Sequence, residues 1–237
     1  MHNRLLAPFV RLTRFERRLW LVSLLCAAVS FILSPERDAL TLIASLVGLT
    51  SLILNARGEV LGQVLMVLFS FIYGVISYSF AYYGEMITYL GMTMPIAAAA
   101  VVSWLRHPFK DSAEVAVRPI AKNELLCLLL LTALVTWVFY FILRELGTAS
   151  LMVSTLSVLT SFLGASLTFL RSPYYALGYA ANDVVLIALW ILASLENPAY
   201  LPMILCFVMF LVNDLYGYVS WRQMQRRQAS VPNPPRG

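Results

Sequence analysis

Charged residues are scarce in this chain: 12% of its 237 residues are Asp, Glu, Lys or Arg, whereas 60% are hydrophobic. An ordinary globular domain carries roughly a quarter charged residues. A soluble chain of this length also needs far more polar surface to cover its core. The scarcity of charge therefore excludes a soluble protein. It indicates an all-α integral membrane protein, because apolar blocks in a bilayer form helices.

Histidine and cysteine are also rare. Both histidines, His2 and His107, lie outside the apolar blocks, so we expect no metal cluster. The three cysteines lie inside apolar blocks, which favours buried thiols over a disulfide framework. The sequence also lacks a phosphate loop, an HExxH motif and a nucleophile elbow. We therefore expect no enzyme, no catalytic residues and no cofactor.

Eight apolar blocks approach the length of about 20 residues that a helix needs to cross a bilayer. They are residues 19–34, 39–56, 60–81, 84–104, 124–143, 149–170, 173–195 and 200–221. The first block is the shortest, and a signal peptide flanked by Arg17 and Arg18 is its alternative. No small-x-small cleavage motif follows Ser34, which favours a membrane helix.

The basic residues indicate the orientation. With eight spans, every lysine and arginine except Arg37 and Arg144 falls on the same side of the membrane. The positive-inside rule then predicts a multi-pass protein of the cell membrane with both termini in the cytoplasm. The net charge of +5 comes from short clusters between apolar blocks. Such clusters fit anionic lipid headgroups better than nucleic acid.

An internal repeat divides the chain. Blocks 39–56 and 149–170 both carry a stripe of small polar residues, which is also typical of plain helix packing, and an arginine follows each of them. Blocks 84–104 and 200–221 both close with a Ser–Trp pair. The repeat predicts two parallel three-helix bundles joined by a linker helix, an arrangement that places a transport site between the halves. The expected segments are an N-terminal basic segment with a first helix (1–38), a first bundle (39–105), a cytoplasmic loop and linker helix (106–148), a second bundle (149–222) and a disordered tail (223–237).

Ionisable side chains at membrane depth are costly, and they mark candidate functional residues. Asp183 lies near the middle of its block, on one helical face with Tyr179 and Trp190. Asp214 lies in the inner half of the last block, where an ion pair with Arg222 is the structural alternative. Aromatic faces around a carboxylate suit a flat cation, and amide side chains suit an amide or sugar hydroxyls. The predicted substrate-binding residues are Gln63, Tyr73, Tyr179, Asn182, Asp183, Trp190, Asn213 and Asp214.

Several motifs resemble the PnuC-type nicotinamide riboside (vitamin B3) transporter family. They are the stretches at residues 73–78, 83–93, 179–183 with Trp190, and 213–218 ending at Trp221. The resemblance covers about residues 40–225. It implies a fold similar to the SWEET sugar transporters, facilitated uptake of nicotinamide riboside for NAD biosynthesis, and a homotrimer.

The chain departs from this family at one motif. Nicotinamide riboside carriers typically show a WxxW pair about one turn before the Asn/Asp position, whereas residues 176–179 read Ala-Leu-Gly-Tyr. Relatives that carry thiamine or riboflavin are therefore the near alternatives. Two further hypotheses are proton-coupled transport through Asp183 or Asp214, and a non-transporting membrane subunit that docks a cytoplasmic partner on the 105–123 loop.

Overall fold

The computed structural model describes residues 7–33, 38–79, 82–110, 112–148 and 150–230, and the regular elements in these ranges are helices. In chain order they are α2 (Arg14–Leu33), α3 (Ala39–Ala56), α4 (Val60–Ser79), α5 (Tyr83–Ile87), the π-helical turn η1 (Thr88–Thr93), α6 (Met94–Arg106), α7 (Lys122–Glu145), α8 (Leu151–Phe169), α9 (Tyr175–Glu196), the 3-10 turn η2 (Pro198–Tyr200) and α10 (Leu201–Ala229). The all-α prediction is confirmed.

Among the described residues, seven helical segments are long and apolar enough to cross a bilayer, whereas the sequence predicted eight. They are α3, α4, the continuous run Tyr83–Arg106, α7, α8, α9 and α10. The predicted first span forms α2, which begins at Arg14 rather than at residue 19. The extra turn brings Glu16 and three arginines into the first five residues of α2, so only the 15 residues after them are free of charged side chains.

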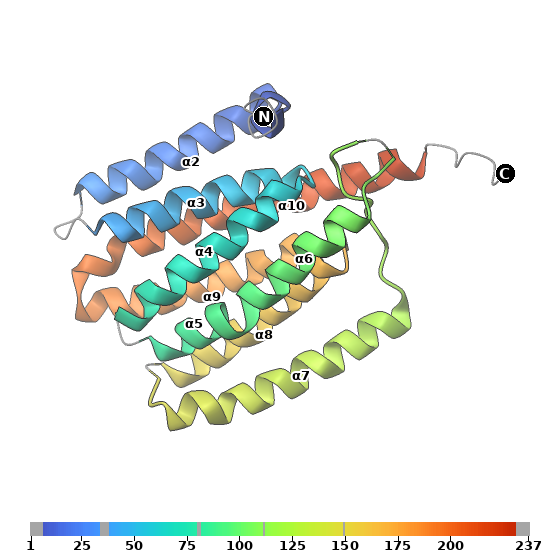
Figure 1. The fold of residues 1–237 in the computed structure, drawn as a ribbon. Helices are drawn as coiled ribbons and strands as arrows, with labels where there is room; N and C mark the ends of the chain where they lie inside the picture. Colours follow the sequence, from blue (N-terminus) through green and yellow to red (C-terminus); the bar gives the residue numbers. More distant parts are fainter. Residues whose placement is uncertain (1–6, 34–37, 80–81, 111, 149, 231–237) are drawn as a thin grey trace.

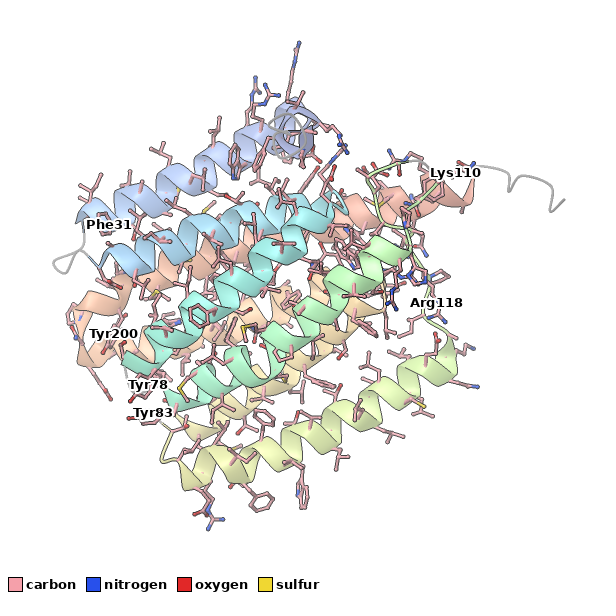
Figure 2. The ribbon with its side chains drawn as sticks, viewed as in Figure 1. Phe31, Tyr78, Tyr83, Lys110, Arg118 and Tyr200 are labelled. Atoms are coloured by element: carbon pink, nitrogen blue, oxygen red, sulfur yellow. The ribbon has the colours of Figure 1, made fainter. Side chains whose placement is uncertain are left out.

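The long helices lie side by side, with α2 and α7 on opposite outer sides of the bundle (Figure 1). The start of α2 and the end of α10 lie at the same end (Figure 1). Lys110 and Arg118 lie at that end, and Tyr78, Tyr83 and Tyr200 lie at the opposite one (Figure 2). We call these the basic end and the aromatic end. The arginine-rich connections therefore gather at one end, as the positions of the basic residues in the sequence predicted.

The two Ser–Trp pairs make reciprocal contacts at the basic end. Trp104 at the end of α6 donates its indole N–H to the Thr168 carbonyl of α8 at 3.1 Å, and Ser103 donates to Phe169 at 3.1 Å. Trp221 of α10 donates to the Asn55 carbonyl of α3 at 2.8 Å, and Ser220 donates to Ala56 at 2.7 Å. Each pair thus satisfies carbonyls that the last turn of a helix leaves without an intrahelical donor.

Helices α8 and α9 cross at two glycines. A Cβ atom built on Gly178 would lie 2.6 Å from the Cα of Gly164, and one on Gly164 would lie 3.0 Å from the Tyr179 nitrogen. Glycine at both positions lets the two backbones touch, as small residues do where membrane helices pack closely. This crossing fixes the start of α9, which carries Tyr179, Asn182 and Asp183.

Helix α10 is longer than predicted. It continues to Ala229, so residues 223–229, predicted as part of a disordered tail, are helical instead. Contacts with the 107–121 loop hold this extension, since Gln228 accepts from the Val117 amide at 2.8 Å and donates to the Val115 carbonyl at 3.1 Å. The end of the predicted tail, residues 231–237, lies outside the described residues.

Candidate functional site

Two buried aspartates face each other between α9 and α10. Asp183 and Asp214 are 3% and 2% exposed, and their carboxyl groups lie within hydrogen-bonding reach of each other. Asp214 does not pair with Arg222, which instead donates to Gln225 at 2.9 Å and to the Tyr174 hydroxyl at 3.3 Å. The structural alternative for Asp214 is therefore wrong, and the two carboxyl groups form one acidic centre inside the helix bundle.

Asn182 anchors this part of α9 to α8. Its Oδ1 atom accepts hydrogen bonds from Ser161 at 2.9 Å, Thr160 at 3.0 Å and Ser157 at 3.2 Å. Its amide group also bonds Tyr89 of η1. The small polar stripe of α8, attributed to helix packing in the sequence, thus supplies the donors that orient one amide next to the acidic centre.

An aromatic cluster lies toward the aromatic end from the acidic centre. Trp190 is fully buried and donates its indole N–H to the Tyr73 hydroxyl at 3.1 Å. The Tyr73 ring lies 4.4 Å from Tyr89 and 5.6 Å from Phe207, and the Trp190 ring lies 5.1 Å from Tyr82. Tyr73 and Trp190 were predicted for one site, and the structure joins them directly.

Tyr179 lies beside the acidic centre, and the centroids of the Tyr179 and Tyr175 rings are 6.4 Å apart. These tyrosines supply aromatic rings where residues 176–179 lack the WxxW pair. Ala176 in the first position of that motif is fully buried, and the Cβ position of Gly217 on α10 lies 3.5 Å from its Cβ. A tryptophan at residue 176 would therefore need space that α10 fills in this chain.

Two predicted site residues lie elsewhere. Gln63 donates to the Asn55 side chain at 2.9 Å, near the Trp221 contact at the basic end. Asn213 donates to Ser23 of α2 at 2.9 Å and to the Met209 carbonyl at 2.8 Å, so it faces α2 while its neighbour Asp214 faces α9. Successive helical residues point about 100° apart, which explains why adjacent residues reach different neighbours.

Glu85 and Tyr89 are not among the predicted site residues, but both lie next to them in the structure. Glu85 is fully buried and accepts a hydrogen bond from Ser157 at 3.4 Å, so it lies next to the hydroxyls that hold Asn182. The signal was present, because Glu85 is an acid inside an apolar block. A position at the start of an apolar block is typical of the membrane interface, whereas in the structure Glu85 packs against Ser157 of α8.

Unpaired polar atoms gather on the elements around this centre. Among the described residues, buried oxygen atoms without a partner include those on Ser70 and Ser77 of α4, Thr88 and Thr93 of η1, Glu85 Oε1, Asp183 Oδ2 and Asp214 Oδ2. Buried polar atoms are nearly always hydrogen-bonded in native proteins, to protein or to water. This group of atoms therefore offers hydrogen-bonding capacity to a polar solute inside the bundle.

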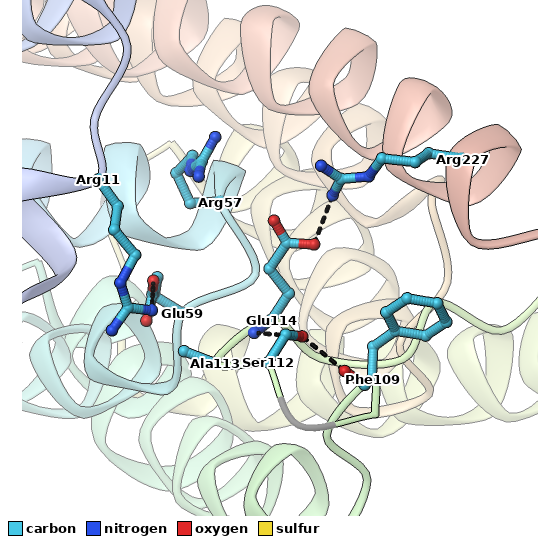
Figure 3. Close-up of a pocket in the computed structure, with 8 residues that line it drawn as sticks. All are labelled: Arg11, Arg57, Glu59, Phe109, Ser112, Ala113, Glu114 and Arg227. Atoms are coloured by element: carbon cyan, nitrogen blue, oxygen red, sulfur yellow. Dashed lines mark hydrogen bonds and ion pairs between the residues drawn. The ribbon is translucent and has the colours of Figure 1, made fainter. Parts of the chain in front are cut away.

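A separate polar pocket of about 760 Å³ opens at the basic end. Figure 3 shows Glu59 and Glu114 between the surrounding arginines, with Arg11 bound to Glu59 at 2.9 Å and Arg227 bound to Glu114. Burial raises the pKa of Glu59, and the Arg11 and Arg57 charges partly offset this. The ion pairs join the segment before α2, the α3–α4 turn, the 107–121 loop and the end of α10.

Two proteins of known activity are similar to the chain over most of its length. The nicotinamide riboside transporter PnuC of Neisseria mucosa is 27% identical over 224 residues, which cover 92% of this chain and 84% of that protein. The PnuC of Haemophilus influenzae is 23% identical over 211 residues, which cover 88% of this chain and 90% of that protein.

A solved structure has the same fold. The crystal structure of the vitamin B3 transporter PnuC superposes with a TM-score of 0.81 at 25% identity, covering 92% of this chain and 94% of that chain. The family model of the nicotinamide mononucleotide transporters matches residues 38–223, from just before α3 to near the end of α10. The chain therefore belongs to the nicotinamide mononucleotide transporter family of multi-pass membrane proteins.

Proposed function

We propose that this protein mediates the facilitated uptake of nicotinamide riboside. The observation that carries the proposal is the acidic centre of Asp183 and Asp214, buried beside aromatic rings and an amide in a fold shared with PnuC transporters. Nicotinamide riboside is a flat pyridinium cation with an amide and a ribose. Rings can stack on its cationic face, a carboxylate can balance its charge, and unpaired hydroxyls can bond its polar groups.

Under this proposal, some of the predicted residues contact the solute and the others hold the helices in place. Asp183, Asp214, Tyr179, Tyr73 and Trp190 lie around the acidic centre and the aromatic cluster, where we propose that they contact the solute. Asn182 holds α8 and Tyr89 in place. Gln63 and Asn213 bond residues of α3 and α2 and support the helix packing.

Purified protein in liposomes is expected to take up labelled nicotinamide riboside in a saturable way. A carrier with a single site saturates because each molecule binds before it crosses, whereas leakage through lipid rises in proportion to concentration. The measurement is the initial rate against concentration, with protein-free liposomes as the control. Excess unlabelled thiamine should leave the rate unchanged. Absence of uptake together with clear thiamine binding would contradict the assignment of the solute.

We also propose that the protein lies in the cell membrane with both termini in the cytoplasm. The gathering of arginines at the basic end supports this orientation. In a variant without the native cysteines, cysteine at Asn197 is expected to react with an impermeant maleimide in intact cells. Cysteine at Ser230 should react only after permeabilisation. Both positions are exposed, at opposite ends of α10. The reverse pattern of labelling would place the basic end outside.

The predicted division into two parallel three-helix bundles with α7 as the linker helix is part of the same proposal. The reciprocal contacts of the two Ser–Trp pairs support it, because equivalent residues of the two halves make equivalent bonds. The homotrimer implied by the resemblance stays a prediction.

A further inference from the structure

The helices around the acidic centre contribute no positively charged residue close to it. Helices α3, α4, α8 and α9 contain no lysine, arginine or histidine. The first basic residue of α10 is Arg222, two helical turns beyond Asp214, and it bonds Tyr174 and Gln225 instead. A carboxylate at membrane depth is costly without a positive charge to balance it. Its balancing charge must therefore come from a proton or from a bound solute.

The contact between the two carboxyl groups limits how many charges they carry. Two carboxylates in contact repel each other, and neither can donate a hydrogen bond to the other. A proton held between them removes one charge and supplies the donor. No other described side chain donates to the Oδ2 atoms of Asp183 and Asp214. The two carboxyl groups can still form a hydrogen bond with each other if they share one proton. The pair then titrates as a unit.

We propose that Asp183 and Asp214 share one proton, and that the single negative charge left on the pair selects a monocationic solute over a neutral one of the same shape. This inference rests on the proposed uptake of nicotinamide riboside and names the feature of that solute which the site recognises. The pair binds by charge, and the unpaired hydroxyls bind the polar groups.

The groups that face the pair are consistent with this role. Residues of α9, α10, η1 and α5 contribute ionisable side chains around it, and those identified in the structure are Tyr175, Tyr179, Tyr89, Cys206 and Glu85. None of them carries a positive charge. Glu85 is the other acid of this region, but Ser157 of α8 bonds its carboxyl group, so it contacts the neighbouring helix.

The first test compares two ligands that differ by one charge: nicotinamide riboside and its uncharged dihydropyridine form. Isothermal titration of the wild-type protein in detergent measures both dissociation constants. We expect the cation to bind at least about 30-fold more tightly, which corresponds to about 2 kcal/mol for one desolvated charge contact. Equal affinity for the two forms would overturn this inference and leave the proposed function in place. Binding of neither form would overturn both.

The second test uses asparagine, which resembles a protonated aspartate in shape and can donate a hydrogen bond. One of the two single variants, Asp183→Asn or Asp214→Asn, is expected to keep the preference for the cation over the neutral form, since asparagine replaces the protonated partner and the other aspartate keeps its charge. The double variant should lose the preference for the cation. The inference is wrong if both single variants lose that preference, or if the double variant keeps it. It is also wrong if Glu85→Gln removes the preference, because the selecting charge would then lie on Glu85.

A matched control separates these effects from general loss of charge. Asp38→Asn makes the same chemical change at the exposed start of α3, where the side chain accepts from the Leu40 and Thr41 amides. Asparagine can cap a helix equally well, so this variant should bind both ligands as the wild type does. Thermal unfolding of every variant reports its folding, and the comparison of ligands on the wild type needs no variant at all.

Discussion

Gly178→Ala is expected to destabilise the protein by about 2 kcal/mol, although alanine favours helix formation more than glycine does. The new Cβ would lie 2.6 Å from the Cα and 2.8 Å from the nitrogen of Gly164, so two helix backbones would have to separate. Overpacking of this kind costs about 3 kcal/mol, and the gain in helix propensity returns about 1 kcal/mol. Unfolding titrations in mixed detergent micelles measure the difference.

Gly91→Ala is the matched control for Gly178→Ala. A Cβ on Gly91 would meet only the Ile87 side chain, at 3.8 Å, because this position is exposed on η1. The same substitution should therefore leave the free energy of unfolding unchanged or raise it slightly. Equal destabilisation by both variants would show that the α8–α9 crossing tolerates an added carbon atom, contrary to the geometry.

Trp190→Ala is expected to weaken the binding of nicotinamide riboside about 100-fold. The indole is fully buried and bonds the Tyr73 hydroxyl, so its loss removes a ring from the aromatic cluster and leaves that hydroxyl without its donor. A cation next to an aromatic ring away from water gains about 2 kcal/mol or more, and disorder of Tyr73 adds to the loss. Isothermal titration gives the dissociation constant.

Two further variants serve as the conservative change and the control for Trp190→Ala. Trp190→Phe keeps a ring but removes the bond to Tyr73, so the loss should be smaller, about fivefold. Trp137→Ala deletes an indole of α7 that is 62% exposed on the outer side of the bundle, and it should leave binding unchanged. A Trp190→Ala protein that folds and binds like the wild type would remove the aromatic cluster from the proposed site.

The helices were largely predictable because bilayer physics fixes the length and composition of a spanning segment. The error at α2 has a physical cause: apolar content predicted a span at residue 19, but local hydrogen bonds between Thr13 and Glu16 start the helix earlier. The extension of α10 to Ala229 depends on the 107–121 loop, a contact over more than a hundred residues that no local pattern reports.

The candidate site was predictable in its residue types and less so in its geometry. Helical periodicity put Asp183 and Trp190 on one face of α9. It could not show that Asp214 would meet Asp183 while Asn213 turned toward α2, because the pairing of helices is not encoded in the spacing along one helix. Glu85 was missed for a related reason, since its contact with Ser157 depends on how α5 packs against α8, which the spacing along one helix does not encode.

The reciprocal Ser–Trp contacts have a consequence for how often the basic end opens. Any motion that separates α6 from α8 and α10 from α3 there breaks four hydrogen bonds, two donated by α6 and two by α10. At about 1 kcal/mol each, the cost is about 4 kcal/mol, which limits an open form to about one molecule in a thousand. Because α6 is bonded to α8 and α10 is bonded to α3 by equivalent residues, opening this end requires both sets of hydrogen bonds to break. In the proposed carrier, the rate of transport would therefore depend on how often these four hydrogen bonds break together.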